Sequence, residues 1–263
     1  MEDRTMMTNV VLISGASSGF GVEFAKIFAA KGHNLLVVAR SEDKLIELKK
    51  SLEKKYGIQV YVFSQDLAKE GSAEKVKAYV KENGLMVEML INNAGFGDYG
   101  RFADSELAKQ TQMINLNDRS LVEMTHTFLP AMIKRGKGKI LNVASVASFE
   151  AGPMMSVYYA SKAFVLSFTE SLSEELRGTG VTVTALCPGP TNTDFSKAAD
   201  MPAGRLANMF RFTQPIDVAK CGYSALMRGQ VIVIPGVLNN LGIIAVKLLP
   251  RAFVRKVVGL LQK

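Results

Sequence analysis

Short apolar runs alternate along the chain with longer segments in which apolar residues recur every three or four positions. The short runs predict buried strands, and the longer segments predict helices. Strands are expected at residues 10–13, 35–39, 59–63, 89–91, 140–143, 181–186 and 231–234, and helices at residues 22–31, 44–55 and 73–82. Strands that are apolar throughout and alternate with helices are typical of a parallel sheet covered on both faces. The pattern therefore predicts an α/β fold built on a doubly wound parallel sheet.

The sequence shows no break in composition, low-complexity linker or internal repeat that would divide it. We therefore expect a single domain over residues 1–263. Its core would cover about residues 8–236, and residues 237–263 would form an amphipathic C-terminal extension.

Within the extension, residues 241–249 are apolar apart from Lys247, and Pro250 separates them from a second helical piece. Both pieces are too short and too charged to span a membrane. Two uses of this segment remain open. It packs over the substrate pocket or against another subunit, or it makes a peripheral contact with a membrane surface through residues 241–263.

Charge is distributed unevenly along the chain. The formal net charge is +8, and no acidic residue follows Asp217, whereas seven lysines and arginines do. A solvated basic face explains this pattern, and attraction to an anionic membrane surface is the sharper alternative. Nucleic acid is not expected as a partner, because no recognisable nucleic-acid module accompanies the charge.

The composition excludes several kinds of chemistry. Two cysteines and two histidines are too few for a disulfide framework or a His/Cys metal site, so no metal is expected. Acid–base chemistry would then depend on Tyr, Lys, Ser or carboxylates. The N-terminus carries Glu2 and Asp3 and no long apolar run, which is unlike a signal peptide. A reducing, cytoplasmic compartment is the expected location.

The first predicted strand runs directly into a glycine-rich turn, residues 14–21, which a helix follows. Glycines at this place let the backbone approach a pyrophosphate at the positive end of the helix, as in Rossmann-type domains. No Gly-Lys-Ser/Thr sequence follows, so a nucleotide-hydrolysing P-loop is excluded. The expected cofactor contacts in this turn are Gly15, Ser17, Ser18, Gly19, Phe20 and Gly21.

The end of the second predicted strand indicates which dinucleotide binds. Domains that bind NAD often place an acidic residue there for the ribose 2′-hydroxyl, but this sequence has Ala39, Arg40 and Ser41. A guanidinium matches the oxygens of a 2′-phosphate with forked, charge-assisted hydrogen bonds. The sequence therefore favours NADP(H), with Arg40 and Ser41 in contact with it; the alternative is that Arg40 is an ordinary surface residue.

Tyr158 and Lys162 lie four residues apart and would share one face of a helix. A neighbouring ammonium group favours the phenolate and lowers the pKa of a phenol. Such a pair could supply a proton donor or acceptor. Taken alone, the spacing is also common in structural helices.

Several motifs occur together, in order and with matching spacing: residues 14–21, residues 92–95, Asn115, Ser145, the Tyr158/Lys162 pair and residues 188–191. In this combination the chain, from about residue 10 to residue 235, resembles the classical short-chain dehydrogenase/reductase family. Ser145 precedes Tyr158 by thirteen residues, as the family pattern requires.

The resemblance implies a role for each matching residue. Tyr158 would be the general acid/base, and Lys162 would lower its pKa and hold the nicotinamide ribose. Ser145 would bind the substrate oxygen, and Asn115 would hold a water in the proton relay. The further cofactor contacts that it implies are Asp66, Leu67, Asn93, Ala94, Gly95, Tyr158, Lys162, Pro188, Gly189, Thr191 and Thr193. Family members are usually dimers or tetramers, so a homodimer or homotetramer is expected.

The substrate is less readable from the sequence. Phe96, Phe149, Met154 and Met155 flank the motifs, and Phe195, Met201, Leu206, Met209, Phe210 and Phe212 fall where the family carries a lid. Flexible Met and Phe side chains suit a bulky apolar, steroid-like or lipid-like substrate, and ordinary core packing would also explain them. The hypothesis is an NADP(H)-dependent oxidoreductase that moves hydride between the nicotinamide and a ketone, aldehyde or secondary alcohol. The alternatives are a catalytically weak nucleotide sensor and a peripheral membrane-binding protein on the same fold.

Overall fold

The computed structural model describes residues 7–191 and 214–262. Its centre is a seven-stranded parallel sheet in the order β3-β2-β1-β4-β5-β6-β7. The strands are β1 Thr8–Ser14, β2 Asn34–Ala39, β3 Val60–Ser64, β4 Leu85–Asn92, β5 Gly138–Val143, β6 Val181–Leu186 and β7 Ile232–Val233. The strand order reverses between β1 and β4, where doubly wound sheets bind their ligands. The predicted fold class is thereby confirmed.

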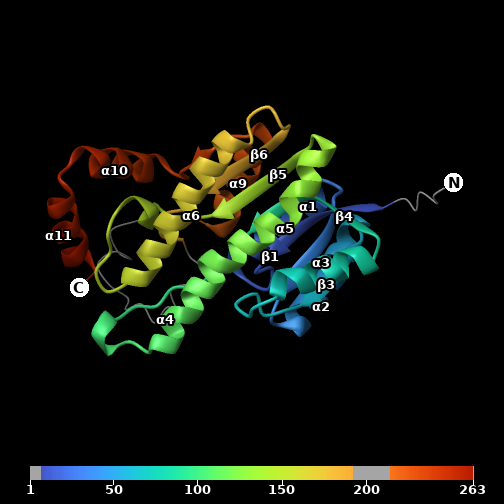
Figure 1. The fold of residues 1–263 in the computed structure, drawn as a ribbon, viewed down its shortest axis with the longest axis horizontal. Coiled ribbons are helices and arrows are strands. Elements are labelled where there is room, and N and C mark those ends of the chain that lie inside the picture. The colour runs from blue at the N-terminus through green and yellow to red at the C-terminus, as the bar shows by residue number, and fades with distance from the viewer. Residues whose placement is uncertain (1–6, 192–213, 263) are drawn as a thin grey trace.

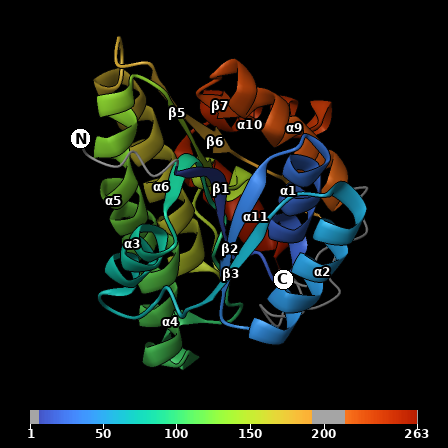
Figure 2. The same cartoon turned by 90° about the vertical axis from the view of Figure 1, so that its right-hand side faces the viewer.

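Helices cover both faces of the sheet (Figures 1 and 2). Their bounds are α1 Gly19–Ala30, α2 Glu42–Tyr56, α3 Ser72–Glu82, α4 Leu107–Ile114, α5 Ser120–Arg135, α6 Ser156–Glu175, α9 Pro215–Arg228, α10 Val237–Leu248 and α11 Arg251–Leu261. Figure 2 shows α1, α2 and α9 on one side of the sheet and α3, α5 and α6 on the other. Three shorter turns are η1 Phe102–Asp104, η2 Asn115–Arg119 and η3 Val146–Phe149.

Alternate residues of the central strands supply the two halves of the core. In β1, Val11 and Ile13 pack with α1, α2 and α9, whereas Val10 and Leu12 pack with the layer of α3, α5 and α6. All four are fully buried. Because both faces of the strand are covered, its sequence is apolar throughout rather than alternating.

A polar network crosses the middle of this apolar core. Asn92 and Asn142 are partners in the register of β4 and β5, and the Nδ2 of Asn92 donates to the Oδ1 of Asn142 at 2.9 Å. Asn92 also donates to Thr125 Oγ1 of α5, and Asn142 donates to Thr169 Oγ1 of α6. Two strands and two helices are thus fixed just where the strands end at the candidate site.

Two helices form the C-terminal extension that was expected over residues 237–263. Its first helix, α10, begins at Val237, earlier than the apolar segment 241–249 indicated, and α11 follows Pro250. Proline cannot continue the first helix, because it lacks an amide hydrogen and clashes with the preceding turn. Among the described residues, no helix is long and apolar enough to cross a membrane.

Candidate active site

The carboxyl ends of the central strands bring the predicted motifs to one edge of the sheet. Ser14 at the end of β1 connects two of them. Its hydroxyl donates to the carbonyl of Ile91 at 3.2 Å and accepts from the backbone N–H groups of Asn93 (2.9 Å) and Ala94 (3.0 Å). The Nδ2 of Asn93 returns hydrogen bonds to the carbonyls of Ser14 and Gly15. The glycine-rich turn and residues 93–95 therefore form one rigid wall.

Two glycines in this turn are required by close packing. A Cβ at Gly21 would lie 2.2 Å from the carbonyl oxygen of Gly15 and 2.8 Å from the Cα of Ala16. Gly15 has φ +65°, and a Cβ there would lie 2.9 Å from the Cα of Ala94. The backbone segments of the turn and of Ala94 thus pack tightly together at the N-terminus of α1, where amide dipoles favour an anion. These features fit a pyrophosphate.

The end of β2 also fits the predicted cofactor. Ala39 is buried, and Arg40 and Ser41 are exposed. No carboxylate stands at this strand end, and the guanidinium of Arg40 faces solvent beside the start of α2. The arrangement leaves the positive charge free to meet a phosphate and places no carboxylate at residues 39–41 to bind a ribose 2′-hydroxyl.

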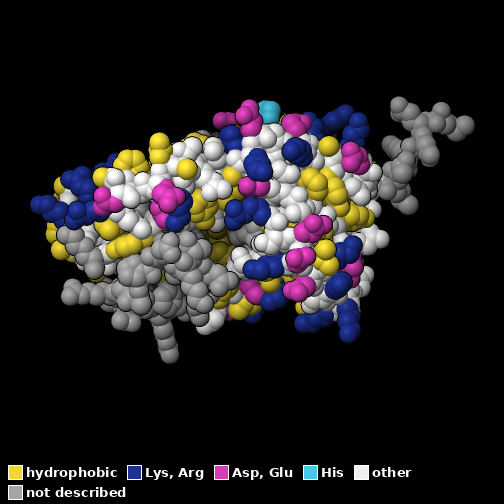
Figure 3. All heavy atoms as spheres, turned by 90° about the horizontal axis from the view of Figure 1, so that it is seen from below, with side chains coloured by type: hydrophobic (Ala, Val, Ile, Leu, Met, Phe, Trp, Pro, Cys, Tyr) yellow, Lys and Arg dark blue, Asp and Glu magenta, His cyan; other side chains and the backbone are white. Residues whose placement is uncertain are grey.

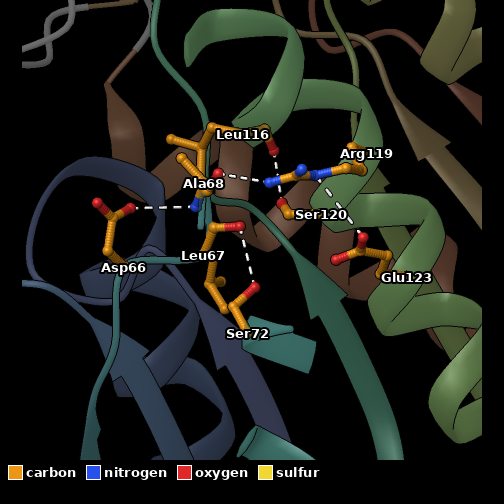
Figure 4. Close-up of polar contacts among 8 residues, drawn as sticks. All are labelled: Asp66, Leu67, Ala68, Ser72, Leu116, Arg119, Ser120 and Glu123. Carbon is orange, nitrogen blue, oxygen red and sulfur yellow. Dashed lines mark hydrogen bonds and ion pairs between the residues drawn. The ribbon is translucent and has the colours of Figure 1, made fainter. Parts of the chain in front are cut away.

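Asp66 and Leu67 lie in the loop after β3 (Figure 4). The carboxylate of Asp66 accepts from the N–H of Ala68 at 3.0 Å, and Leu67 is buried. The same loop is held from the other side by Arg119, whose Nη2 donates to the carbonyl of Ala68 at 2.5 Å. Arg119 also lies 3.6 Å from Glu123 Oε1. The loop with the predicted cofactor contacts Asp66 and Leu67 is therefore anchored to the end of η2.

Ser145 and Tyr158 meet across the site. Ser145 follows β5, is 8% exposed, and hydrogen-bonds the Tyr158 side chain from the start of η3. The hydroxyl of Ser148, by contrast, donates to the carbonyl of Lys162 at 2.7 Å. Ser148 is thus engaged in holding η3 to α6, and Ser145 is the serine that reaches the phenol.

The pKa of Tyr158 moves in the direction opposite to the sequence-based expectation. Burial raises it to about 12, and the hydrogen bond with Ser145 offsets only part of this effect. Lys162 is not close enough to dominate: its Nζ lies 5.8 Å from the centre of the Tyr158 ring. In this structure the phenol is held protonated, which suits a proton donor.

Lys162 is buried at the centre of the site. Its Nζ donates to the carbonyl of Val143 at 2.8 Å, and a Cβ on Gly95 would lie 3.5 Å from the same atom. Burial lowers the pKa of Lys162 to about 8, and the negative charge of Asp118 opposes this shift. Tyr158 and Lys162 lie one helical turn apart on α6, as their spacing predicts.

Asn115, which the resemblance placed in the proton relay, lies at the start of η2 and is only partly buried. Within residues 7–191 and 214–262 its side chain forms no hydrogen bond. Asn117 is 1% exposed, and its Nδ2 donates to Ser161 Oγ of α6 at 3.1 Å. A Cβ on Gly95 would lie 2.9 Å from Asn117 Oδ1, so this amide lies beside the wall that Lys162 also touches.

The reason for the difference is a π-helical turn. Residues 115–119 wind more loosely than the α-helices on either side, and such turns re-aim side chains and are frequent at functional sites. The sequence does contain a pattern that indicates that Asn117 faces the interior. Met113, Leu121 and Met124 are buried at helical spacing with it, and Asn115 falls off that face.

Asp118 is a second site residue that sequence reasoning missed. Its Oδ1 is buried and, within the described chain, has no hydrogen-bond partner. Burial raises its pKa to about 6, and the charge of Lys162 opposes the shift. An acid thus lies within electrostatic reach of the buried lysine.

Residues 188–191 follow β6 and are covered by α10. Thr191 is buried, and its hydroxyl donates to the carbonyl of Gly189 at 2.9 Å. A Cβ on Gly189 would lie 2.5 Å from the Nδ2 of Asn239 on α10. Pro188 accepts from the N–H of Val146, which places this loop beside η3. Thr193 lies outside the described residues.

The segment before α6 borders the catalytic side chains. Met154 is a non-glycine residue with φ 70°, a strained conformation for a methionine, and its carbonyl accepts from Gly100 N–H at 2.8 Å. Met155 is buried, and Phe96 and Phe149 are partly buried. The predicted lid residues Phe195, Met201, Leu206, Met209, Phe210 and Phe212 lie outside the described residues.

Comparisons with known proteins show the family to which the chain belongs. Residues 9–202 match the model of the family described as short chain dehydrogenase. Sulfoacetaldehyde reductase 2 of Chromohalobacter salexigens is 40% identical over 192 residues, which cover 72% of this chain and 75% of that protein.

Two solved structures are similar over nearly the whole chain. A short-chain dehydrogenase from Sphingobium yanoikuyae in complex with NADPH has 29% identity and a TM-score of 0.81, and the match covers 92% of this chain and 94% of that chain. A 7β-hydroxysteroid dehydrogenase has 27% identity and a TM-score of 0.86, covering 98% and 99%.

Proposed function

Because the chain belongs to the short-chain dehydrogenase family, an oxidoreductase family that acts on carbonyl and alcohol groups, we propose that it is an NADP(H)-dependent reductase of ketones or aldehydes. The central observation is the contact of Ser145 with Tyr158 beside the buried ammonium of Lys162. These side chains offer a hydrogen-bond donor, a proton donor and a fixed positive charge at one place.

NADP(H) fits the residues at the edge of the sheet. The cradle of Gly15 and Gly21 accepts a pyrophosphate without a side-chain clash, and Arg40 offers the charge that a 2′-phosphate needs. The Sphingobium yanoikuyae dehydrogenase was solved with NADPH, which supports the same choice. When bound, the cofactor supplies or accepts the hydride.

The protein's own part is to hold the carbonyl and move a proton. Ser145 binds the carbonyl oxygen and, with Tyr158, stabilises the negative charge that develops on it. The Tyr158 hydroxyl then donates its proton, which its high pKa keeps in place until that charge forms. General acid catalysis of this kind contributes about 10²–10⁴-fold to the rate.

Lys162 and Asn117 complete the proposed site. The Lys162 ammonium, fixed by the carbonyl of Val143, stabilises the phenolate that proton transfer leaves behind. We assign to Asn117, in place of Asn115, the role of holding a water in the proton relay. Of the two, only Asn117 is buried against Gly95 and Ser161.

For the substrate we propose a bulky apolar carbonyl compound. Phe96, Phe149 and Met154 border the site without adding charge, and a 7β-hydroxysteroid dehydrogenase has closely similar architecture. A small aldehyde is the second candidate, because the relative from Chromohalobacter salexigens is named for sulfoacetaldehyde. Nothing in the described site favours the nucleotide-sensor alternative, since Ser145 hydrogen-bonds Tyr158 and the Lys162 ammonium lies 5.8 Å from the centre of the Tyr158 ring.

The deciding experiment is a panel of steroid ketones, long-chain and aromatic ketones, and sulfoacetaldehyde, followed by NADPH consumption with NADH as the control. Preference for the bulky ketones by kcat/KM would support the proposal. Preference for sulfoacetaldehyde would transfer the assignment to small anionic aldehydes, and no turnover of any carbonyl compound would contradict the reductase function itself.

We further propose a homodimer or homotetramer that works in the cytoplasm. Exposed Phe102 and Ile114 line a cavity of about 440 Å³ beside α4 and α6, and Leu107 of α4 and Phe164 of α6 are exposed as well. A second copy that covered them would remove this surface from water. Light scattering on the purified protein gives the mass. The location is proposed because Cys187 and Cys221 are free thiols, and cell fractionation tests it.

A further inference from the structure

Helix α10 presents its apolar face to solvent. Val237, Leu241, Ile244 and Leu248 recur at helical spacing and are exposed by 55% to 80%, and Leu238 beside them is 71% exposed. An ordinary surface helix turns such a stripe toward the core. Here the pattern is reversed, so the stripe has no partner within the described chain.

The inner side of α10 is already occupied. Asn239 contacts the loop at Gly189, Ile243 is buried, and Lys247 lies over the ring of Phe149 with its Nζ 5.4 Å from the ring centre. The helix is therefore fixed to the rest of the protein by the side that carries Asn239, Ile243 and Lys247. It cannot turn its apolar stripe inward without losing these contacts.

Helix α11 repeats the arrangement in part. Val254 and Val258 are buried, and Gln262 beyond the helix donates to the hydroxyl of Tyr159 at 2.7 Å. Phe253 and Leu260 remain 53% and 67% exposed on the outer side. The inner side of α11 thus packs on the protein, while its outer side exposes further apolar side chains.

Basic side chains accompany this surface, and neither of the two helices carries an acidic residue. Arg251, Arg255 and Lys256 of α11 are all exposed, and the chain has no Asp or Glu after Asp217. In Figure 1 α10 and α11 form the left end of the molecule, and Figure 3 shows blue and yellow side chains together at that end, with a few magenta ones nearby. The surface therefore combines exposed leucines with an unbalanced positive charge.

We propose that the outer faces of α10 and α11 dock onto the surface of an anionic lipid bilayer. Apolar side chains would enter the interface, and lysine and arginine would meet the phosphate headgroups. The twelve residues of α10 span only about 18 Å, far less than the bilayer core, so the helices would lie on the membrane rather than cross it.

A second copy of the chain fits this surface less well. In a two-fold symmetric dimer the same patch faces itself. The three cations of α11 would then face their own copies, and neither α10 nor α11 carries a carboxylate to neutralise them. Anionic lipid satisfies both the apolar and the charged side chains.

The test is co-sedimentation of the full-length protein with phosphatidylcholine vesicles, with and without about 30% phosphatidylglycerol. We expect binding to the anionic vesicles, little binding to the neutral ones, and release at about 0.5 M NaCl. Leu241→Gln and Leu248→Gln should each weaken binding about tenfold, because each removes an inserted apolar side chain. Arg255→Gln and Lys256→Gln should each weaken it about fivefold.

Matched controls carry the same substitutions elsewhere on the surface. Ile46→Gln with Ile133→Gln removes two exposed apolar side chains, and Lys54→Gln with Lys55→Gln removes two exposed cations. Both should bind as the wild type does. None of the changed residues belongs to the proposed active site, so carbonyl reduction and melting temperature report that each variant is folded.

Three results would overturn the proposal. The first is no binding of the full-length protein to anionic vesicles, and the second is equal loss of binding in the control variants. The third is a change of oligomeric mass in the Leu241 and Leu248 variants without any vesicle binding, which would assign the surface to a second copy. Vesicle binding does not depend on turnover, so it can fail while the proposed reductase function stands.

Discussion

The side-chain amide of Asn117 forms two hydrogen bonds with the backbone of Phe96. Its Nδ2 donates to the Phe96 carbonyl at 3.0 Å, and its Oδ1 accepts from the Phe96 N–H at 3.0 Å. Since the same Nδ2 also reaches Ser161, one amide joins the loop after β4 to the helix that carries Tyr158 and Lys162. The π-helical turn of η2 directs this side chain inward, so the turn has a direct consequence for the site.

Replacing this amide should therefore matter more than replacing its neighbour. Asn117→Ala leaves the Phe96 backbone and Ser161 without their partner, and we expect kcat to fall about 10²-fold, with a loss of about 1–3 kcal/mol in stability. Asn115→Ala should stay within about twofold of the wild type. Steady-state kinetics and thermal melts on both variants check this, and a larger loss of kcat in Asn115→Ala would return the relay to Asn115.

The proton donor is tested by removing a single oxygen atom. Tyr158→Phe keeps the ring and its packing but deletes the hydroxyl, so kcat should fall by about 10²–10⁴-fold while NADPH still binds. Tyr159→Phe is the matched control, because it removes the neighbouring hydroxyl that accepts from Gln262. It should retain most of the activity. Half of the wild-type kcat in Tyr158→Phe would exclude this tyrosine as the acid.

The fold and most of the site could be predicted because they depend on local patterns. Apolar runs define the strands, and the motif residues follow strand ends, where a parallel sheet gathers them at one edge. The spacing of Tyr158 and Lys162 is a property of one helix. None of these inferences requires knowledge of a distant contact.

What the sequence could not supply depends on burial and on helix geometry. The assignment of Asn115 rests on the resemblance to the family, and the order of residues alone does not show the π-helical turn that directs Asn117 into the site instead. The pKa of Tyr158 was expected to fall because a cation is near, but the cost of burying a charged phenolate is the larger effect. Similarly, the outward face of α10 is visible only once Asn239 and Ile243 are seen to face inward.

Cofactor choice is expected to depend on the end of β2. Ala39→Asp combined with Arg40→Gln removes the cation and adds an acceptor for a ribose 2′-hydroxyl. Charge-assisted hydrogen bonds contribute about 1.5–3 kcal/mol, so the ratio of NADPH to NADH affinity should fall about ten- to hundredfold. Direct titration of both dinucleotides measures the ratio, with Lys50→Gln on α2 as an exposed-cation control. A wild-type preference for NADH would contradict the role of Arg40.

The pH dependence of reduction should report Lys162 and its partner Asp118. The Lys162 pKa is about 8, so the ammonium is present below that pH and is lost as the pH rises through it. Because the ammonium stabilises the phenolate left by proton transfer, kcat/KM should decline on the alkaline side near pH 8. The carboxylate of Asp118 raises the Lys162 pKa, and at this pH it is ionised, since its own pKa is about 6.

Asp118→Asn removes that negative charge while keeping the shape of the side chain. The Lys162 pKa should fall further, and the alkaline decline should move to lower pH by about half to one pH unit. Glu123→Gln is the matched control, because it neutralises an acid on α5 that pairs with Arg119 instead. Its profile should coincide with that of the wild type. If the alkaline decline of kcat/KM occurs at the same pH in Asp118→Asn as in the wild type, it reports the titration of another group, and Asp118 does not act on Lys162.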